Sequence, residues 1–254
     1  MARPSSSTAS TRAAEVPQAS VELEAVTKVY GSGPTAVRAL AGVDLRIEEG
    51  AFVAIMGASG SGKSTAMNII GFFQSPTAGA YRFMGVDGSR LGRRQRTLLR
   101  RHFLGFVFQG FNLLARTTAL ENVELPLIYR GTAPAERRRL GLAALEKVGL
   151  AGREHHTSAE LSGGRQQRMA IARAIVSEPA LLLADEPSGN LDSRTSLEVM
   201  ALLGGLNRDR GTADAGRGDQ ACTPGHQPQC SSRVPDHARH LHRRGCRDRP
   251  GDYR

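Results

Sequence analysis

Apolar and polar residues alternate along the first part of the chain. The stretches at residues 21–24 (Val-Glu-Leu-Glu) and 43–47 (Val-Asp-Leu-Arg-Ile) change character at every position. A period of two is typical of strands with one buried and one solvated face, so this region predicts an antiparallel sheet. Residues 1–20 are rich in Ser, Ala and Thr and lack the apolar centre of a secretion signal, which predicts a disordered tail and a cytosolic protein.

Two short apolar runs, residues 51–56 and 180–184, predict buried strands. Between them, residues 112–160 follow a helical pattern, with one helix expected from residue 133 to a C-terminal cap at Gly149. Residues 195–206 predict a further helix. The pattern therefore predicts an α/β fold that carries an antiparallel β subdomain and a helical subdomain at about residues 112–160.

A glycine-rich loop directly follows the first apolar run. Residues 57–65 read Gly-Ala-Ser-Gly-Ser-Gly-Lys-Ser-Thr and fit the phosphate-binding pattern G-x-x-x-x-G-K-[ST]. Backbone N–H groups of such a loop surround an anion, and the helix that follows adds its partial positive charge. Lys63 would reach the β- and γ-phosphates, and the Ser64 hydroxyl would bind Mg²⁺. The predicted nucleotide-binding residues are Gly57, Ser59, Gly60, Ser61, Gly62, Lys63, Ser64 and Thr65.

Two carboxylates, Asp185 and Glu186, follow the second apolar run. The C-terminal end of a parallel strand faces the ligand crevice in α/β folds, so Asp185 is the candidate Mg²⁺ ligand. Glu186 points elsewhere and is the candidate general base that polarises the attacking water. The alternative is a strand that ends in a solvated acidic turn, and the phosphate-binding loop favours the functional interpretation.

A third block begins a helix at residues 161–168, which read Leu-Ser-Gly-Gly-Arg-Gln-Gln-Arg. Ser162 is placed to cap this helix, and the two glycines leave backbone N–H groups open to an anion. The chain then has two helix N-termini that can bind an anion. In a head-to-tail homodimer, each nucleotide would contact the first N-terminus of one copy and the second N-terminus of the other. The residues predicted to bind ATP across that dimer are Leu161, Ser162, Gly163, Gly164 and Gln166.

Together, in this order and spacing, the three blocks resemble the nucleotide-binding subunits of ATP-binding-cassette (ABC) transporters, over about residues 21–211. The resemblance implies a P-loop NTPase (RecA-like) core that hydrolyses ATP with Mg²⁺. It implies a homodimer around two ATPs and an integral-membrane permease as partner, at the cytoplasmic face of the plasma (inner) membrane. Lys63, Gln109 and Glu186 are the implied catalytic residues.

Further roles follow from the same resemblance. Tyr30 is similar to the aromatic residue that stacks on adenine, Gln109 to a glutamine that contacts Mg²⁺ and water, and Asp192 to an aspartate at the dimer seam. The stretches at residues 67–71 and 108–114 resemble the ATPases of the macrolide-export and lipoprotein-release group, which use separate permease subunits.

Charge and composition weigh against other classes. The formal net charge is +10, but the basic clusters at residues 93–96 and 137–139 have no interleaved aromatic residues, and Trp is absent. Solvated helix faces are therefore favoured over a nucleic-acid surface, and no nucleic acid partner is expected. A soluble ABC ATPase acting on DNA or ribosomes is the alternative class, and the single cassette without a heptad run argues against it.

The pattern breaks after Gly211. The resemblance implies a buried apolar strand that ends in Thr-His, yet residues 213–220 read Ala-Asp-Ala-Gly-Arg-Gly-Asp-Gln, and Asp219 occupies the position of the histidine. Residues 211–254 contain no Ile, Phe, Met, Lys or Glu, so they bury too little apolar surface to offset their ordering entropy. The interpretation is a frameshift near codon 212, which makes residues 212–254 an atypical tail; a natural disordered tail and a catalytically impaired remnant are the alternatives.

Overall fold

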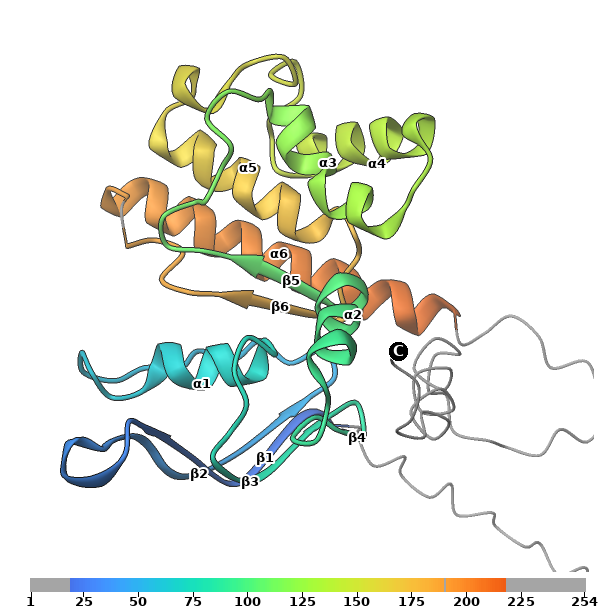
Figure 1. The fold of residues 1–254 in the computed structure, drawn as a ribbon. Helices are drawn as coiled ribbons and strands as arrows, with labels where there is room; N and C mark the ends of the chain where they lie inside the picture. The colour runs from blue at the N-terminus through green and yellow to red at the C-terminus, as the bar shows by residue number, and fades with distance from the viewer. Residues whose placement is uncertain (1–18, 190, 218–254) are drawn as a thin grey trace, which may run out of the picture.

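The computed structural model describes residues 19–189 and 191–217, and all structural statements concern this part of the chain. It contains an antiparallel sheet, a parallel pair of strands, and helices on both sides of that pair (Figure 1). The greater part of the predicted N-terminal tail and residues 218–254 of the atypical tail lie outside the described residues.

The antiparallel sheet has the strand order β2-β1-β3-β4. β1 (Ala19–Tyr30) pairs on one edge with β2 (Val37–Glu48), after a short 3-10 turn at Gly33–Thr35. On its other edge β1 pairs with β3 (Ala78–Phe83), which pairs in turn with β4 (Val86–Asp87). The antiparallel sheet predicted from the alternating pattern is therefore present.

One face of this sheet is buried with residues from α1 (Lys63–Ile70) and α2 (Arg93–Phe103). The Tyr81 hydroxyl inside this cluster donates a hydrogen bond of 2.7 Å to the Ile70 carbonyl, so its burial leaves no polar group unpaired. The sheet-side core includes Val21, Leu23, Val26, Ile69, Ile70, Phe72, Tyr81, Phe83 and Leu99.

A parallel pair of strands, β5 (Leu104–Val107) and β6 (Leu181–Ala184), lies between this core and most of the helices. The β6 side chains pack on both faces: Leu183 belongs to the sheet-side core, whereas Leu182 packs against the helical core. Burial on both faces explains why residues 180–184 form a continuous apolar run rather than an alternating one.

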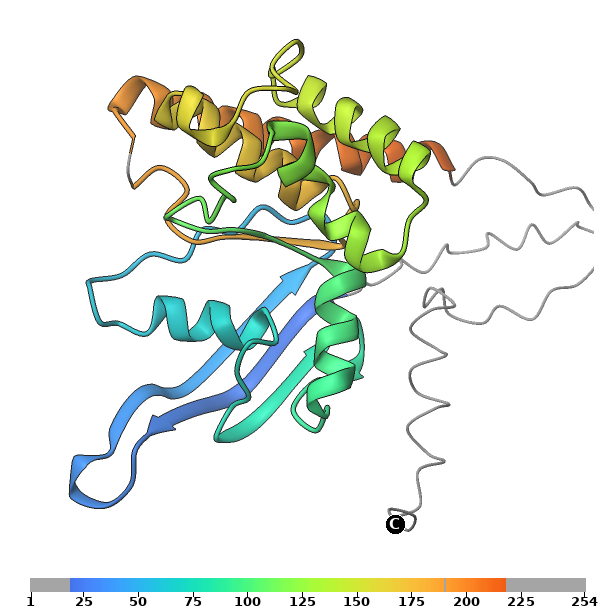
Figure 2. The same ribbon diagram turned by 45° about the horizontal axis from the view of Figure 1, so that its top comes forward.

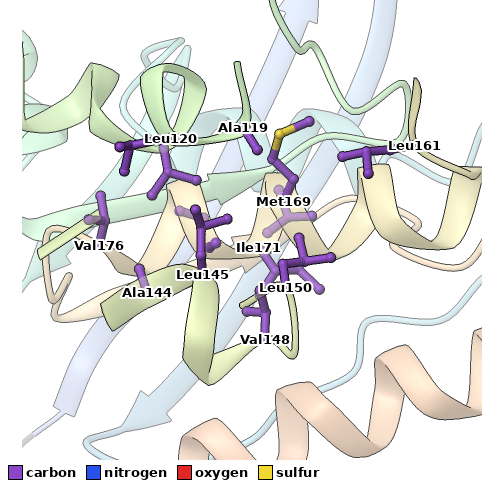
Figure 3. Close-up of a cluster of buried hydrophobic side chains, with 14 of the residues drawn as sticks. Ala119, Leu120, Ala144, Leu145, Val148, Leu150, Leu161, Met169, Ile171 and Val176 are labelled. Atoms are coloured by element: carbon purple, nitrogen blue, oxygen red, sulfur yellow. The ribbon is translucent and has the colours of Figure 1, made fainter. Parts of the chain in front are cut away.

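The helical core is formed mainly by α3 (Ala119–Arg130), α4 (Pro134–Lys147) and α5 (Gly163–Ile175). Figure 3 shows side chains from these helices, among them Leu145 and Met169, gathered into one cluster. α4 ends as predicted near Gly149, whose φ of 72° is left-handed. The N–H of the next residue, Leu150, donates to the Leu145 carbonyl at 2.9 Å, which closes the helix end. A 3-10 turn at Ser158–Glu160 precedes α5.

The strand predicted at residues 51–56 is absent, and this prediction was wrong. These residues lie between β2 and α1, belong to no sheet, and are exposed; Phe52 is 54% and Met56 89% accessible. An apolar run becomes a strand only when neighbouring strands satisfy its backbone groups. Among the described residues no strand lies in position to do so, and residues 51–56 remain an extended exposed segment.

α6 (Ser193–Arg217) is longer than the helix predicted at residues 195–206. It starts after the C-terminal end of β6 and runs back along the parallel pair (Figure 2). Val199 and Leu203 belong to the helical core, as their helical spacing predicts. The helix continues six residues beyond Gly211, where the sequence pattern breaks.

Candidate functional site

The predicted phosphate-binding loop adopts a tight conformation that glycine permits. Gly60 and Gly62 have φ values of 79° and 90°, which L-residues with a side chain rarely adopt. A Cβ added to Gly62 would lie 2.5 Å from the Ala39 carbonyl oxygen, and one added to Gly57 would lie 2.6 Å from Ser61 Oγ. Glycine is therefore required at residue 62 both for its dihedral angles and for the close approach of β2.

Lys63 begins α1 and folds back over the loop. Its Nζ donates hydrogen bonds to the carbonyls of Gly57 at 2.8 Å and Ala58 at 2.9 Å. The ammonium group is therefore held at the mouth of the loop, where the N–H groups of the first turn also point. Ser64 and Thr65 follow in that first turn, so the structure brings the predicted loop residues together at one helix start.

The two predicted carboxylates lie at the C-terminal end of the parallel pair. Asp185 directly follows β6, and its N–H donates to the Val107 carbonyl of β5 at 3.0 Å. Glu186 has a φ of 45°, a conformation that costs energy for a residue with a side chain. The prediction that the Glu186 side chain points away from that of Asp185 stays a prediction.

Gln109 and Glu186 are joined directly, although 77 residues separate them in the chain. Gln109 Nε2 donates to Glu186 Oε2 at 2.8 Å. A Cβ added to Gly189 would lie 3.3 Å from Gln109 Nε2 and 3.4 Å from Glu186 Oε2, so the glycine leaves room for this pair. Two of the three predicted catalytic residues thus form one contact; the third, Lys63, lies in the phosphate-binding loop.

Arg173 fixes the loop that follows Gln109, and sequence reasoning missed it. Its guanidinium donates to the Asn112 carbonyl at 2.6 Å and to the Phe111 carbonyl at 2.7 Å. Phe111 and Asn112 have φ values of 59° and 47°, so the arginine holds a strained turn. Burial lowers the pKa of Arg173. The available signal was one charged residue within the otherwise apolar residues 169–176.

The start of α5 carries the second predicted anion site. Ser162 occupies the N-cap position, but its side chain makes no capping hydrogen bond, so the predicted capping role was wrong. Instead Gln166 Nε2 donates to the carbonyls of Ser158 at 2.8 Å and Leu161 at 3.0 Å and closes the turn that precedes the helix. A Cβ added to Gly164 would lie 2.5 Å from Thr195 Cγ2, so this helix start packs closely against α6.

Asp192 lies just before α6 and caps it. Its carboxylate accepts hydrogen bonds from the Thr195 N–H at 3.0 Å and the Thr195 hydroxyl at 2.7 Å. These hydrogen bonds lower the pKa of Asp192. Through Thr195, Asp192 is linked to the close contact with Gly164, so both lie on one surface at the start of α5 and α6.

Tyr30 ends β1 and is partly exposed. Its hydroxyl is hydrogen-bonded to the Gln74 amide oxygen, and Lys28 Nζ lies 5.2 Å from its ring centroid. Both contacts restrain the ring, and the residue is 39% exposed. Its predicted role, stacking on adenine, remains a prediction.

A phosphate-binding loop directly before α1, together with two carboxylates directly after the parallel strand β6, defines a P-loop nucleotide-binding domain. The chain belongs to the ABC transporter family, whose model matches residues 40–189. It resembles a solved dimeric ATP-binding cassette in a post-hydrolysis state bound to ADP and Pi, with a TM-score of 0.69, 46% identity, and coverage of 75% of this chain and 84% of that one. The predicted family and fold class are therefore confirmed.

Two curated proteins are similar in sequence to this chain. The macrolide export ATP-binding/permease protein MacB of Marinobacter nauticus is 53% identical over 76% of this chain, but the match spans only 30% of MacB. An uncharacterized ABC transporter ATP-binding protein of Thermotoga maritima is 50% identical over 72% of this chain and 78% of its own length. The predicted similarity to the macrolide-export group is confirmed. No helix among the described residues is long and apolar enough to cross a membrane.

Proposed function

We propose that the chain is the ATP-binding subunit of an ABC transporter, which dimerises around two ATPs and drives a separate integral-membrane permease at the cytoplasmic face of the membrane. The observation that carries the proposal is the loop at residues 57–65, folded at the start of α1 with Lys63 across its mouth. The match to the Thermotoga maritima ATP-binding protein covers 78% of that protein's length, which supports a subunit that is separate from the permease.

ATP binding uses the residues at the start of α1. The backbone N–H groups and Lys63 bind the phosphates, and Tyr30 offers an accessible ring to the adenine. The described residues hold no cluster of three or more His, Cys, Asp or Glu side chains. Ser64, Gln109 and Asp185 would instead supply three hard oxygen ligands. This set fits Mg²⁺, which takes few protein ligands beside phosphate oxygens and water.

Hydrolysis uses the pair at the end of the parallel strands. Glu186 acts as the general base toward water, and Gln109 orients its carboxylate through the 2.8 Å hydrogen bond. Arg173 holds the loop after Gln109 and thereby fixes the direction from which the amide reaches Glu186.

The second copy supplies the other side of the site. Gly163 and Gly164 leave backbone N–H groups at the start of α5, where the helix carries partial positive charge. This surface also includes Asp192, and it meets the phosphate-binding loop of a second copy in a head-to-tail dimer. The permease, rather than this chain, selects the transported compound.

We expect retained ATP binding with slow turnover. The sequence has Asp219 where the family resemblance places a histidine that contacts the γ-phosphate. Loss of one transition-state contact lowers kcat about 10²–10³-fold.

The test compares ATP affinity and phosphate release in this chain and in the Thermotoga maritima relative. Similar affinity with a kcat at least about a hundredfold lower supports the proposal. Equal kcat values contradict the turnover claim, and absence of ATP binding contradicts the function itself. Recovery of the chain in the soluble fraction of cells that hold its permease contradicts the transport role.

A further inference from the structure

The segment that joins α1 to β3 is fastened to the end of β1 by hydrogen bonds. Lys28 Nζ donates to the Ser75 carbonyl at 2.9 Å, and the Val29 N–H donates to the Thr77 hydroxyl at 3.0 Å. Both donors belong to the last three residues of β1, the strand that Tyr30 ends. Side chains of the joining segment are therefore held within reach of the Tyr30 ring.

Gln74 is the residue of this segment that contacts Tyr30. The Tyr30 hydroxyl donates to Gln74 Oε1, and the Gln74 N–H donates to the Asn68 carbonyl of α1 at 3.1 Å. Lys28 Nζ lies over the same ring, 5.2 Å from its centroid. The hydroxyl contact therefore restrains the direction in which the ring points, and the ammonium group occupies one side of it.

The joining segment is also held from α2, on the side away from β1. Arg100 Nη1 donates to the Phe72 carbonyl at 2.6 Å, and Arg96 Nη1 donates to Ser75 Oγ at 2.7 Å. Hydrogen bonds from a charged donor are stronger than those between neutral groups. Gln74 therefore extends from a segment that is restrained from two elements, which makes it a firm partner for the Tyr30 hydroxyl.

The end of β1 lies close to the phosphate-binding loop. Tyr30 pairs with Val37 of β2, and Ala39, two residues further along β2, has its carbonyl against Gly62 of the loop. Two residues of a strand span only about 7 Å. A nucleotide whose phosphates bind at the loop would therefore bring its base near the Tyr30 ring, where the direction of the ring decides whether the base can stack.

We propose that Gln74 is a positioning residue for nucleotide binding: it holds the Tyr30 hydroxyl so that the ring is oriented before the base arrives, and the base stacks on the side opposite Lys28. This role rests on the proposed function, because it takes Tyr30 as the residue that stacks on the base. A ring that is already oriented loses less rotamer freedom on binding, so the contact raises affinity. Stacking is tolerant of the base, so ATP and GTP gain alike.

The test compares the affinities of the full chain for MgATP and for magnesium tripolyphosphate, which carries phosphates without a base. Gln74→Met removes the acceptor and keeps a side chain of similar length. Gln74→Glu is the matched control, because its carboxylate still accepts from the hydroxyl. We expect Gln74→Met to weaken ATP binding about three- to tenfold and to leave tripolyphosphate binding unchanged, while Gln74→Glu stays close to the unchanged chain for both ligands.

A double-mutant cycle isolates the contact between the two side chains. Tyr30→Phe keeps the ring and removes the hydroxyl, so it should weaken ATP binding by about the same factor as Gln74→Met. Because both changes delete one and the same hydrogen bond, the double variant should bind ATP no more weakly than either single variant.

Four results would overturn the proposal. Equal ATP affinity in Gln74→Met and the unchanged chain shows that the contact does not orient the ring, and the proposed function then stands without it. Equal weakening of ATP and tripolyphosphate shows that Gln74 supports the fold of the site as a whole. Independent effects of Gln74→Met and Tyr30→Phe show that the two residues act separately. Binding of neither ligand by the unchanged chain contradicts the proposed function itself, and the role of Gln74 with it.

Discussion

Arg173 is a partly buried cation whose described hydrogen-bond partners are two backbone carbonyls, and its removal tests the architecture of the site. Arg173→Ala deletes the hydrogen bonds of 2.6 and 2.7 Å to Asn112 and Phe111. Charge-assisted hydrogen bonds contribute about 1.5–3 kcal/mol each, and two bonds of one group are not additive, so the expected loss is about 2–4 kcal/mol of unfolding free energy. In a domain of this size the loss lowers Tm by roughly 5–15 °C.

The assay is urea unfolding followed by circular dichroism. Arg173→Lys should recover only part of the loss, since one ammonium group cannot reproduce the planar bridge between two carbonyls. Arg138→Ala on α4 is the matched control: this arginine is exposed and without a described hydrogen bond, so its removal changes stability by less than about 0.5 kcal/mol. If Arg173→Ala loses no more stability than the control, the two hydrogen bonds of Arg173 do not stabilise the loop at residues 111–112.

Two further predictions concern the helix starts. Gly62→Ala meets both a φ of 90° and the Ala39 carbonyl, whereas Gly60→Ala meets only a φ of 79°, with no atom within 4 Å. The first should cost about 2–3 kcal/mol and the second about 1 kcal/mol by urea unfolding, and equal losses contradict the close approach of β2. Asp192 has a pKa lowered by the hydrogen bonds from Thr195, so its stabilisation is present above about pH 4, its unfolded value, and is lost as pH falls through the lower folded value. The urea midpoint of Asp192→Asn should therefore lie below that of the unchanged chain at pH 6 and approach it at pH 3; a gap that is constant with pH contradicts the assignment.

The sequence predicted those elements whose partners are also in the described chain. β1 and β2 have alternating apolar residues and pair with each other. The apolar run of β6 is buried because β5 pairs with it and the two cores cover its faces. The phosphate-binding loop was predictable because glycine spacing and Lys63 carry the chemistry locally. Long-range contacts could not be predicted. The pattern of residues 169–176 does not indicate that Arg173 donates to the carbonyls of Phe111 and Asn112.

Residues 51–56 mark the limit of pattern reasoning. Their composition is that of a buried strand, and their exposure follows from what lies beside them rather than from their own residues. Ser162 is a second example of a residue whose local pattern gave the wrong prediction. Its type and position favour a helix cap, but the Gln166 side chain closes the turn instead. In both cases the local structure depends on a contact with another residue. For residues 51–56 that residue is distant in sequence, and for Ser162 it lies one helical turn further along.

An equilibrium titration of the full chain and of its Lys63→Ala variant with MgATP tests the ATP site most directly, with circular dichroism to confirm equal helix content. We expect saturable binding that the variant weakens at least about tenfold, because the ammonium group at the mouth of the loop would contact the phosphates. Absence of saturable binding by the unchanged chain, or equal affinity in the variant, contradicts the assignment of residues 57–65 as an ATP site.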